Sequence, residues 1–419
     1  MAMAETTRVE VTRLDVRLNA DPTRVLLRRY GMSSPQQVSN VIARVLALSE
    51  PEVEECWQTV SSEFSYRHRD YEGACQRRFE EMRAHMPEDQ EISPTQVKLL
   101  GASFFMEYAL ECAALFNPSI VAHPDQAGVA EGSLRFILSL RATGEGHISS
   151  ITFRVGVIDA DGGVTLEEGS RFVEAPTLAG DAEGGFSASF PDDVLVAEQA
   201  LFPVTPSQSN GIEDARFVQF EDGTYYGTYT AYDGRDIAPE MVETRDFQNY
   251  RFLDMKGPAL KNKGLALFPR KINGAYWMLG RQDGESLFLM RSENLLEWND
   301  YQPLATPVFD WEMVQIGNCG SPLETEAGWL VLTHGVGPTR KYSIGVLLLD
   351  KDDPGKVIGR LEQPILSPNA DEREGYVPNV VYTCGGIIHG EHLIVPYAIS
   401  DSASRFARFD LKALLATMA

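Results

Sequence analysis

The stretch GTYYGTYTAYDG at residues 223–234 contains the pattern that decides the fold. A turn glycine, Gly223, precedes a run of aromatic and β-branched residues, and the run ends at Asp233 and a second glycine. Aromatic and β-branched residues favour strands, and flanking glycines favour tight hairpins. The stretch therefore predicts one strand of an antiparallel sheet that ends in polar residues.

The same unit recurs five times along the chain. Its turn glycines are Gly132, Gly223, Gly274, Gly328 and Gly390. The longest interval, 132–223, predicts an insertion that holds the glycine- and acid-rich residues 180–185. Repeats of about 40 to 60 residues with four short strands each are typical of propeller blades. We expect a mainly β fold, a five-bladed β-propeller; a β-sandwich is the alternative, although it does not need five copies of one unit.

Residues 34–115 have a different sequence pattern, which predicts helices. Three serines are followed by a proline and by an acid or amide at the spacing of a capping box, namely Ser34, Ser49 and Ser93. The run 97–116 is apolar nearly all round and predicts a long, buried helix. We therefore expect an N-terminal α-helical extension over residues 1–115 and a propeller catalytic domain over residues 116–419.

Composition excludes some partners. Sixty acidic residues against 37 basic ones give a formal charge of −23, which repels nucleic acid and anionic lipid. The five cysteines form no CxxC pair, and the start of the chain lacks the apolar region of a secretory signal. These features predict a cytoplasmic protein that uses no cofactor and no metal, because the pair His123 and Asp125 has no third ligand at sensible spacing.

Residues 211–216, GIEDAR, resemble the GxEDxR signature of glycoside hydrolase family 130. Four further stretches are similar to family motifs in the same order: Phe116-Asn117-Pro118, 267–274, 328–335 and 377–381. The resemblance covers residues 116 to about 405. It implies a five-bladed propeller that cleaves β-mannosides with inversion, using either phosphate or water as the nucleophile. The helical extension is absent from the short phosphorylases of the family.

The resemblance implies that Asp214 donates the proton, through a sugar hydroxyl, to the glycosidic oxygen. Inverting hydrolysis also needs a carboxylate base on the opposite face of the sugar. Glu285 and Glu324 are the candidates, and phosphorylases of the family look more basic at the corresponding stretches. A negative charge there repels phosphate, so the sequence predicts a hydrolase, an exo-β-1,2-mannosidase.

Two alternatives remain open at this stage. In a β-mannoside phosphorylase, Lys271, Arg281 and His334 would bind phosphate, and mannose-1-phosphate would be released. A propeller that binds sugar without catalysis is the second alternative.

The remaining site candidates lie at strand ends or inside the signature. They are predicted to bind sugar hydroxyls: Asn117, Arg141, His147, Glu213, Arg216, Tyr232, Asp233, Asp283 and Asp401. The predicted partner is a β-linked manno-oligosaccharide, with phosphate in the phosphorylase alternative. The apolar run 97–116 also suggests a homo-oligomer.

Overall fold

The computed structural model describes residues 9–86, 90–180 and 185–418. The chain divides into two compact units, which are described separately. Unit 1 comprises the N-terminal segment to Asp21, Glu111–Gly169 and the chain from Ala175 onward; unit 2 comprises Pro22–Leu110 and Ser170–Glu174. The domain boundary at residue 115 stays a prediction, and residues 9–21 group with unit 1 instead of with the helices.

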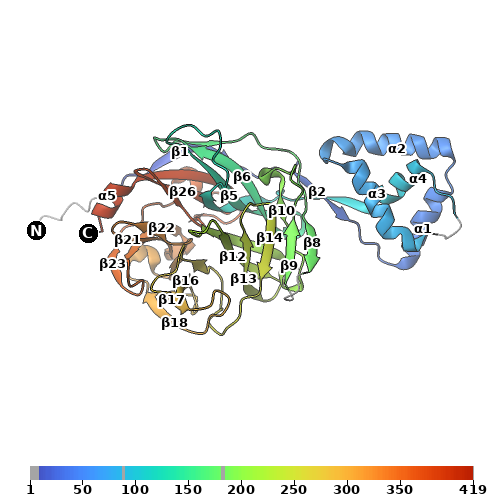
Figure 1. Cartoon of the computed structure of the whole chain (residues 1–419). Coiled ribbons are helices and arrows are strands. Elements are labelled where there is room, and N and C mark those ends of the chain that lie inside the picture. The colour runs from blue at the N-terminus through green and yellow to red at the C-terminus, as the bar shows by residue number, and fades with distance from the viewer. Residues whose placement is uncertain (1–8, 87–89, 181–184, 419) are drawn as a thin grey trace, which may run out of the picture. The chain divides into compact units, whose positions relative to one another are not determined.

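Unit 1 is built from antiparallel strands (Figure 1), so the prediction of a mainly β fold is confirmed. The first sheet segment contains β4 (Ala114–Ala122), β5 (Leu134–Thr143), β6 (Ser149–Ile158), β7 (Val164–Leu166) and β10 (Ala200–Leu201). The second contains β11 (Gly211–Gln219), β12 (Tyr225–Tyr232), β13 (Ile237–Thr244) and β14 (Asn249–Leu253). A single parallel pairing of Gly211 with Ser149 joins these two segments.

Three further sheets follow in chain order. The third contains β15 (Ala266–Leu267), β16 (Tyr276–Gly280), β17 (Leu287–Ser292) and β18 (Tyr301–Ala305). The fourth contains β19 (Gln315–Asn318), β20 (Leu323–Thr325), β21 (Gly328–Val336), β22 (Tyr342–Leu349) and β23 (Val357–Arg360). The fifth contains β24 (Val381–Tyr382), β25 (Ile387–His389), β26 (His392–Ile399) and β27 (Ala403–Asp410), and it is followed by helix α5 (Leu411–Ala416).

The N-terminal strand β1 (Thr12–Leu18) completes the fifth sheet by pairing with β27. Arg13 fixes this strand, since its guanidinium donates to both carboxylate oxygens of the buried Glu372, at 3.1 and 3.2 Å. Strand β1 is thus part of the β unit, which the sequence did not reveal because its partner strand is about 390 residues away.

The five turn glycines have the predicted role. Each has a positive φ, from 56° to 142°, and each opens, or lies two residues before, the strand that pairs with the first strand of its sheet segment: Gly132, Gly223, Gly274, Gly328 and Gly390. A side chain is strained in this backbone region, whereas glycine is not. The predicted insertion is also present, as β8 (Thr177–Gly180) and β9 (Phe186–Ser189) extend the second segment beyond β14. Residues 181–184 of the predicted insertion lie outside the described residues.

Neighbouring sheets pack face to face through apolar side chains. Phe153 of the first segment meets Phe217 of the second, and Phe268 of the third meets Trp329 of the fourth. One buried cluster joins the second to the third segment, and another joins the fourth to the fifth. The fifth also meets the first, through the cluster of Ala114, Phe116 and Ala398 and a hydrogen bond from Cys384 N to Pro118 O at 2.8 Å.

Unit 2 contains α1 (Pro35–Leu46), α2 (Glu50–Phe64), α3 (Tyr71–Met82) and α4 (Pro94–Ala102). The predicted starts of α1, α2 and α4 are confirmed, with Ser34, Ser49 and Ser93 as N-caps. Asp70 caps α3, a start that the sequence analysis did not identify. Ile42 and Val45 of α1 are buried.

The long helix predicted over residues 97–116 is wrong. Helix α4 ends at Ala102, and the chain continues as β3 (Phe105–Ala109), which pairs with β2 (Val25–Arg29), and then as β4 of unit 1. The aromatic residues after Ser103 favour strands, and the strand partners of β3 and β4 override the apolar run. The suggestion of a homo-oligomer was based on this long helix, so that suggestion has no remaining support.

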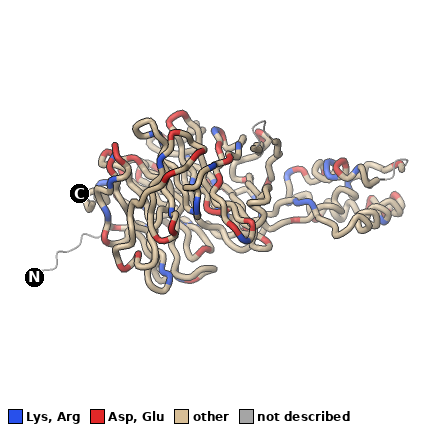
Figure 2. Tube along the Cα trace, turned by 90° about the horizontal axis from the view of Figure 1, so that it is seen from below, with Lys and Arg blue, Asp and Glu red and all other residues tan. Residues whose placement is uncertain are grey.

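Acidic residues are spread over many loops of the chain (Figure 2), in keeping with the net charge of −23. All five cysteines are unpaired. Among the described residues, no helix has the length and apolar character needed to cross a bilayer.

Candidate active site

Two irregularities in the first strands of neighbouring sheet segments create the centre of the site. Pairing of β4 with β5 slips between Phe116 and Ser119, and pairing of β11 with β12 slips between Glu213 and Arg216. The residues inside the slips, Asn117 and Asp214, have φ values of 49° and 55°. Such bulges redirect side chains and are frequent next to active sites. Here they bring Asn117 Nδ2 to 2.7 Å from Asp214 Oδ1, where it donates a hydrogen bond.

Arg141, beside the end of β5, binds both acids of the signature. Its Nη2 donates to Glu213 Oε1 at 2.7 Å, and its Nη1 lies 3.4 Å from Asp214 Oδ1. The guanidinium also packs over the Phe116 ring. Because Arg141 is held on several sides, it fixes the orientation of both carboxylates.

Arg216 is a buried support for the Asp214 bulge. It donates to the Asp214 backbone oxygen, to Cys319 O and to the Tyr382 hydroxyl, each at 2.7 Å. Its guanidinium therefore contacts backbone and the Tyr382 hydroxyl, whereas Glu213 is bound by Arg141.

The surrounding charges set the protonation of the two carboxyl groups. Burial by itself would raise the pKa of Asp214, but the charges of Arg141, Arg216 and Lys263 outweigh it and lower that pKa to about 2. Burial and the charge of Asp214 raise the pKa of Asp401 to about 6, although Arg141 opposes this. Asp401 follows β26 with φ 49° at the same end of its sheet.

A second group of polar side chains adjoins the first. Arg281, just after β16, is buried, and its Nη1 lies 3.1 Å from His334 Nε2. Gln315 also lies 3.1 Å from that nitrogen. The His334 ring contacts the Tyr382 ring, whose hydroxyl binds Arg216, so the two groups are connected.

His334 is neutral in this setting. Burial and the nearby charges of Arg281 and Arg216 hold its pKa well below the usual value. Within the described residues, His334 Nδ1, Asn318 Oδ1 and Asn117 Oδ1 are buried without a hydrogen-bond partner. Buried polar atoms are normally paired, so unpaired ones at a polar cluster are suited to a ligand.

The predicted roles of Glu324 and Lys271 have to be corrected. Both residues lie at the opposite end of the sheets from Asp214. Glu324 accepts hydrogen bonds from Arg270 at 2.7 and 2.8 Å and pairs with Lys351 at 3.2 Å. It lines a cavity with Ile120–Ala122 and Phe217–Gln219, the far ends of β4 and β11. Lys271, next to Arg270, lies over the Tyr276 ring. Neither side chain is positioned to act beside Asp214.

Three other predicted residues, Asp233, Asp283 and Glu285, lie in turns, where the two aspartates accept hydrogen bonds from the backbone. Asp233 accepts from the backbone of Arg235 and Asp236, and Asp283 accepts from the backbone of Glu285 and Ser286. The Glu285 side chain is exposed and has no hydrogen bond or ion pair within the described residues; only its backbone is held, by Asp283 and by Ile316 N.

Tyr232 and His147 lie at the Asp214 end of the strands. Tyr232 ends β12 opposite Gly211. His147 is exposed and its ring centroid lies 5.9 Å from that of Tyr376, which is 63% exposed and lies in the loop that precedes β24. These rings mark the rim of the site.

Three residues of the site escaped the sequence analysis. Lys263 acts on Asp214, Glu213, His334 and Asp401 by its charge, and Arg340 acts on Asp401. Tyr382 links Arg216 to His334. Lys263 lies just before the first strand of the third sheet, and Tyr382 directly follows the fifth family motif. Their places in the sequence could therefore have pointed to these two as site residues.

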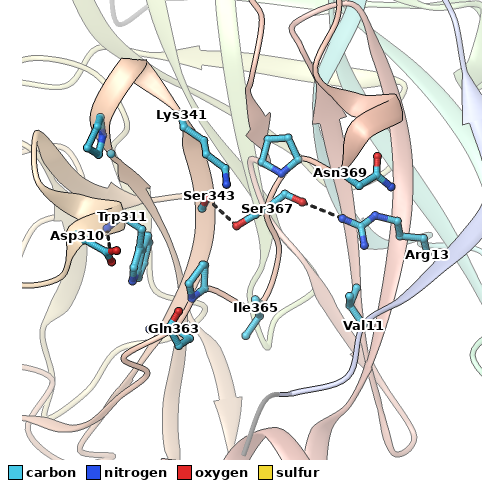
Figure 3. A pocket seen from close by; sticks show the side chains of 14 residues that line it. Val11, Arg13, Asp310, Trp311, Lys341, Ser343, Gln363, Ile365, Ser367 and Asn369 are labelled. Atoms are coloured by element: carbon cyan, nitrogen blue, oxygen red, sulfur yellow. Dashed lines mark hydrogen bonds between the residues drawn. The ribbon is translucent and has the colours of Figure 1, made fainter. Parts of the chain in front are cut away.

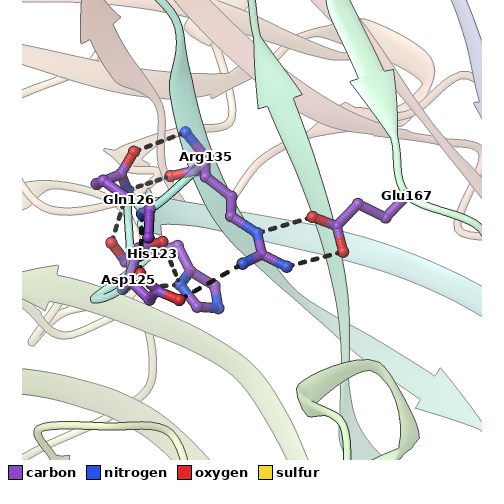
Figure 4. Close-up of polar contacts among 6 residues, drawn as sticks. His123, Asp125, Gln126, Arg135 and Glu167 are labelled. Carbon is purple, nitrogen blue, oxygen red and sulfur yellow. Dashed lines mark hydrogen bonds and ion pairs between the residues drawn. The ribbon is translucent and has the colours of Figure 1, made fainter. Parts of the chain in front are cut away.

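His123 and Asp125 form a turn before β5 (Figure 4). Asp125 N donates to His123 Nδ1 at 2.9 Å, and the adjacent Arg135 pairs with Glu167 at 2.7 Å. No group of three metal-ligating side chains occurs among residues 9–86, 90–180 and 185–418. Metal independence stays a prediction.

Sequence comparison identifies a class of carbohydrate-active enzymes. A family profile described as "beta-1,4-mannooligosaccharide phosphorylase" matches residues 194–419, more than half of the chain. The chain belongs to glycoside hydrolase family 130.

Two curated relatives have 35% identity to this chain. A 1,2-β-oligomannan phosphorylase of Thermoanaerobacter sp. (strain X514) aligns over 50% of this chain and 71% of its own length. A β-1,2-mannobiose phosphorylase of Listeria innocua aligns over 48% of this chain and 59% of its own. These characterised relatives are phosphorylases of β-mannosides.

Solved structures share the fold. The β-1,2-mannobiose phosphorylase from Listeria innocua superposes with a TM-score of 0.56 at 23% identity, covering 73% of this chain and 92% of the other. A glycosyl hydrolase from Bacteroides ovatus superposes with a TM-score of 0.54 at 18% identity, covering 73% and 86%.

Proposed function

We propose that this protein is an inverting β-mannoside phosphorylase that transfers a mannosyl unit to inorganic phosphate. The observation that carries this proposal is a polar group in which Arg281 and His334 are buried and Lys263 is half-buried. It is linked to Asp214 through Tyr382 and Arg216 and through the charge of Lys263. Charged donors bind phosphate strongly, and a guanidinium can offer two parallel hydrogen bonds. The names of the curated relatives support the same reaction.

The argument for hydrolysis loses its basis. It depended on glutamates facing Asp214, but Glu324 is neutralised by Arg270 and Lys351 at the other strand ends. Glu285 is exposed and no contact orients its carboxylate toward the cluster. A general base must lie within hydrogen-bond reach of the water that it activates.

In the proposed reaction, a phosphate oxygen attacks the anomeric carbon from the face opposite the leaving group. The glycosidic carbon–oxygen bond breaks, and the proton of Asp214 reaches the leaving oxygen through a sugar hydroxyl. Asn117, Arg141 and Asp401 bind the mannosyl unit. The product is mannose-1-phosphate of inverted anomeric configuration.

Phosphate also supports the proton donor. Free Asp214 is ionised because three cations lower its pKa. A bound phosphate dianion offsets part of this positive charge and favours the protonated acid. Water as the nucleophile would give no such compensation.

We further infer that the five sheet segments are the blades of a closed five-bladed propeller. Consecutive segments share apolar clusters, and the fifth meets the first through Phe116 and Ala398. On the basis of its relatives, the preferred linkage is β-1,2.

The test is an assay of purified protein on β-1,2- and β-1,4-mannobiose, with and without phosphate. Mannose-1-phosphate that forms only with phosphate is expected. Free mannose released at an equal rate without phosphate would overturn the proposal and restore the hydrolase.

A further inference from the structure

A second cavity lies outside the Asp214 site, between the fourth and fifth sheets of unit 1 (Figure 3). Its volume is about 790 Å³, within the range of roughly 300–1,000 Å³ typical of small-molecule sites. Trp311 and Lys341 line one side, and Arg13 and Asn369 line the other. The mechanism proposed above uses none of these residues.

The Trp311 ring is rigidly held at the cavity wall. Its indole N–H donates to Glu362 O at 2.9 Å. The ring packs against Gly335 and Gly345, where an added Cβ would come within 2.4 and 2.3 Å of it. Both glycines thus leave space for the ring, which remains partly exposed and lines the cavity. A fixed aromatic face of this kind suits the apolar face of a sugar ring.

Both charged and neutral hydrogen-bonding groups line the cavity around that ring, and the charged ones are Asp310, Lys341 and Arg13. Gln363 lines the cavity and its amide has no hydrogen bond within the described residues; Asn369 offers an amide N–H₂, since only its oxygen is used, by Asp371 N. The charge of Arg13 is matched by Glu372, and Ser367 donates to Ser343 at 2.9 Å. Asp310 and Lys341 carry opposite charges and Arg13 is paired, so the lining has no excess of positive charge. It therefore suits a polyhydroxylated, uncharged ligand more than an anion.

One loop connects this cavity to the candidate active site. Gly337, Pro338 and Lys341 line the cavity, whereas Arg340 of the same loop acts on Asp401 by its charge. At the base of the loop, Val336 pairs with Gln315, which contacts His334. The same loop therefore borders the cavity with Gly337, Pro338 and Lys341 and carries Arg340, whose charge acts on Asp401.

We propose that this cavity is a distal subsite that binds the non-reacting sugars of a β-mannooligosaccharide. The choice of ligand rests on the proposed function. The subsite makes the enzyme favour long chains over mannobiose, because only long chains reach Trp311 and Gln363.

The experiment compares mannobiose and mannohexaose on the full chain with Trp311→Ala and Gln363→Ala. Each variant is expected to raise KM for mannohexaose roughly tenfold, the effect of one lost contact, and to leave mannobiose within about twofold. Gln302→Ala, an exposed glutamine of the third sheet, is the control and should change neither. Two variants are used because Trp311 packs on the strand that carries His334, whereas Gln363 does not.

Calorimetric binding of mannohexaose without phosphate separates this proposal from the reaction type. Weaker binding in both variants supports the subsite even if no mannose-1-phosphate forms. The proposal would be overturned if wild type and both variants had equal affinity for mannohexaose and an equal ratio of the KM for mannohexaose to the KM for mannobiose. The cavity would then be left to a protein partner.

Discussion

The first strands of the sheets have two ends, and each end carries acids and arginines. At the Asp214 end, the charged side chains converge from several sheets, and those of Arg141, Glu213 and Asp214 are only 18%, 13% and 10% exposed. Within the described residues, this end also holds buried polar atoms without partners. At the Glu324 end, the side chains are partly exposed and saturated by their own ion pairs. The same residue types thus make a reactive centre at one end and a structural contact at the other.

The comparison teaches that convergence and burial, not residue type, separate a site from a surface ion pair. Both glutamates of the original hydrolase hypothesis have the right chemistry. Only position relative to Asp214 excludes Glu324, and the strand ends decide that position. The predictions below test this contrast between the two ends.

The largest expected effect is on the acid itself. Asp214→Asn should lower kcat/KM by about 10³-fold, since general acid catalysis contributes roughly 10²–10⁴-fold. Glu324→Gln, the matched change at the other end, should stay within about twofold. Initial rates of mannose-1-phosphate formation measure both. An equal loss of kcat/KM in the two variants would contradict the assignment of the active site to the Asp214 end.

Two arginines give the next contrast. Arg281→Ala should raise KM for phosphate by about 10- to 100-fold, the effect of lost charged hydrogen bonds. Arg270→Ala removes an arginine that binds Glu324 and should leave the phosphate KM within about twofold. Initial rates over a range of phosphate concentrations provide the values. A larger increase in the phosphate KM for Arg270→Ala than for Arg281→Ala would place phosphate at the Glu324 end, which contradicts this mechanism.

A smaller effect concerns pH. Burial and the charge of Asp214 raise the pKa of Asp401 to about 6, so Asp401 becomes ionised only as the pH rises through that value. Its ionised form accepts hydrogen bonds from sugar hydroxyls, and kcat/KM should therefore rise severalfold between about pH 5 and 7. Asp401→Asn should remove this inflection from the pH–rate profile. An inflection that persists in the variant belongs to another group.

The smallest effect is on stability. Glu324→Gln should lower the free energy of unfolding by less than about 1 kcal/mol, because the pair is partly exposed and screened by solvent. Hydrogen bonds from Arg270 lower the folded-state pKa of Glu324 to about 2 from 4.5. The difference from wild type should thus be full above about pH 5 and shrink as the pH falls toward 2. Urea unfolding at pH 7 and pH 3 measures it.

Local signals in the sequence predicted much of the fold. The five turn glycines and the serine caps were identified correctly, because a turn or a cap depends on a few adjacent residues. The helix over residues 97–116 failed because an apolar run fits either a helix or buried strands, and β2 and β5 supply strand partners.

The sequence by itself determined a mainly β chain with a family 130 signature around Asp214 and with helices started by Ser34, Ser49 and Ser93. Only the tertiary structure decided which charged residues share an end with Asp214. It brought in Lys263, Arg340 and Tyr382 and removed Glu324 and Lys271. The physical reason is that strand direction and two bulges set where each side chain lies, and both depend on pairing between residues far apart in the chain.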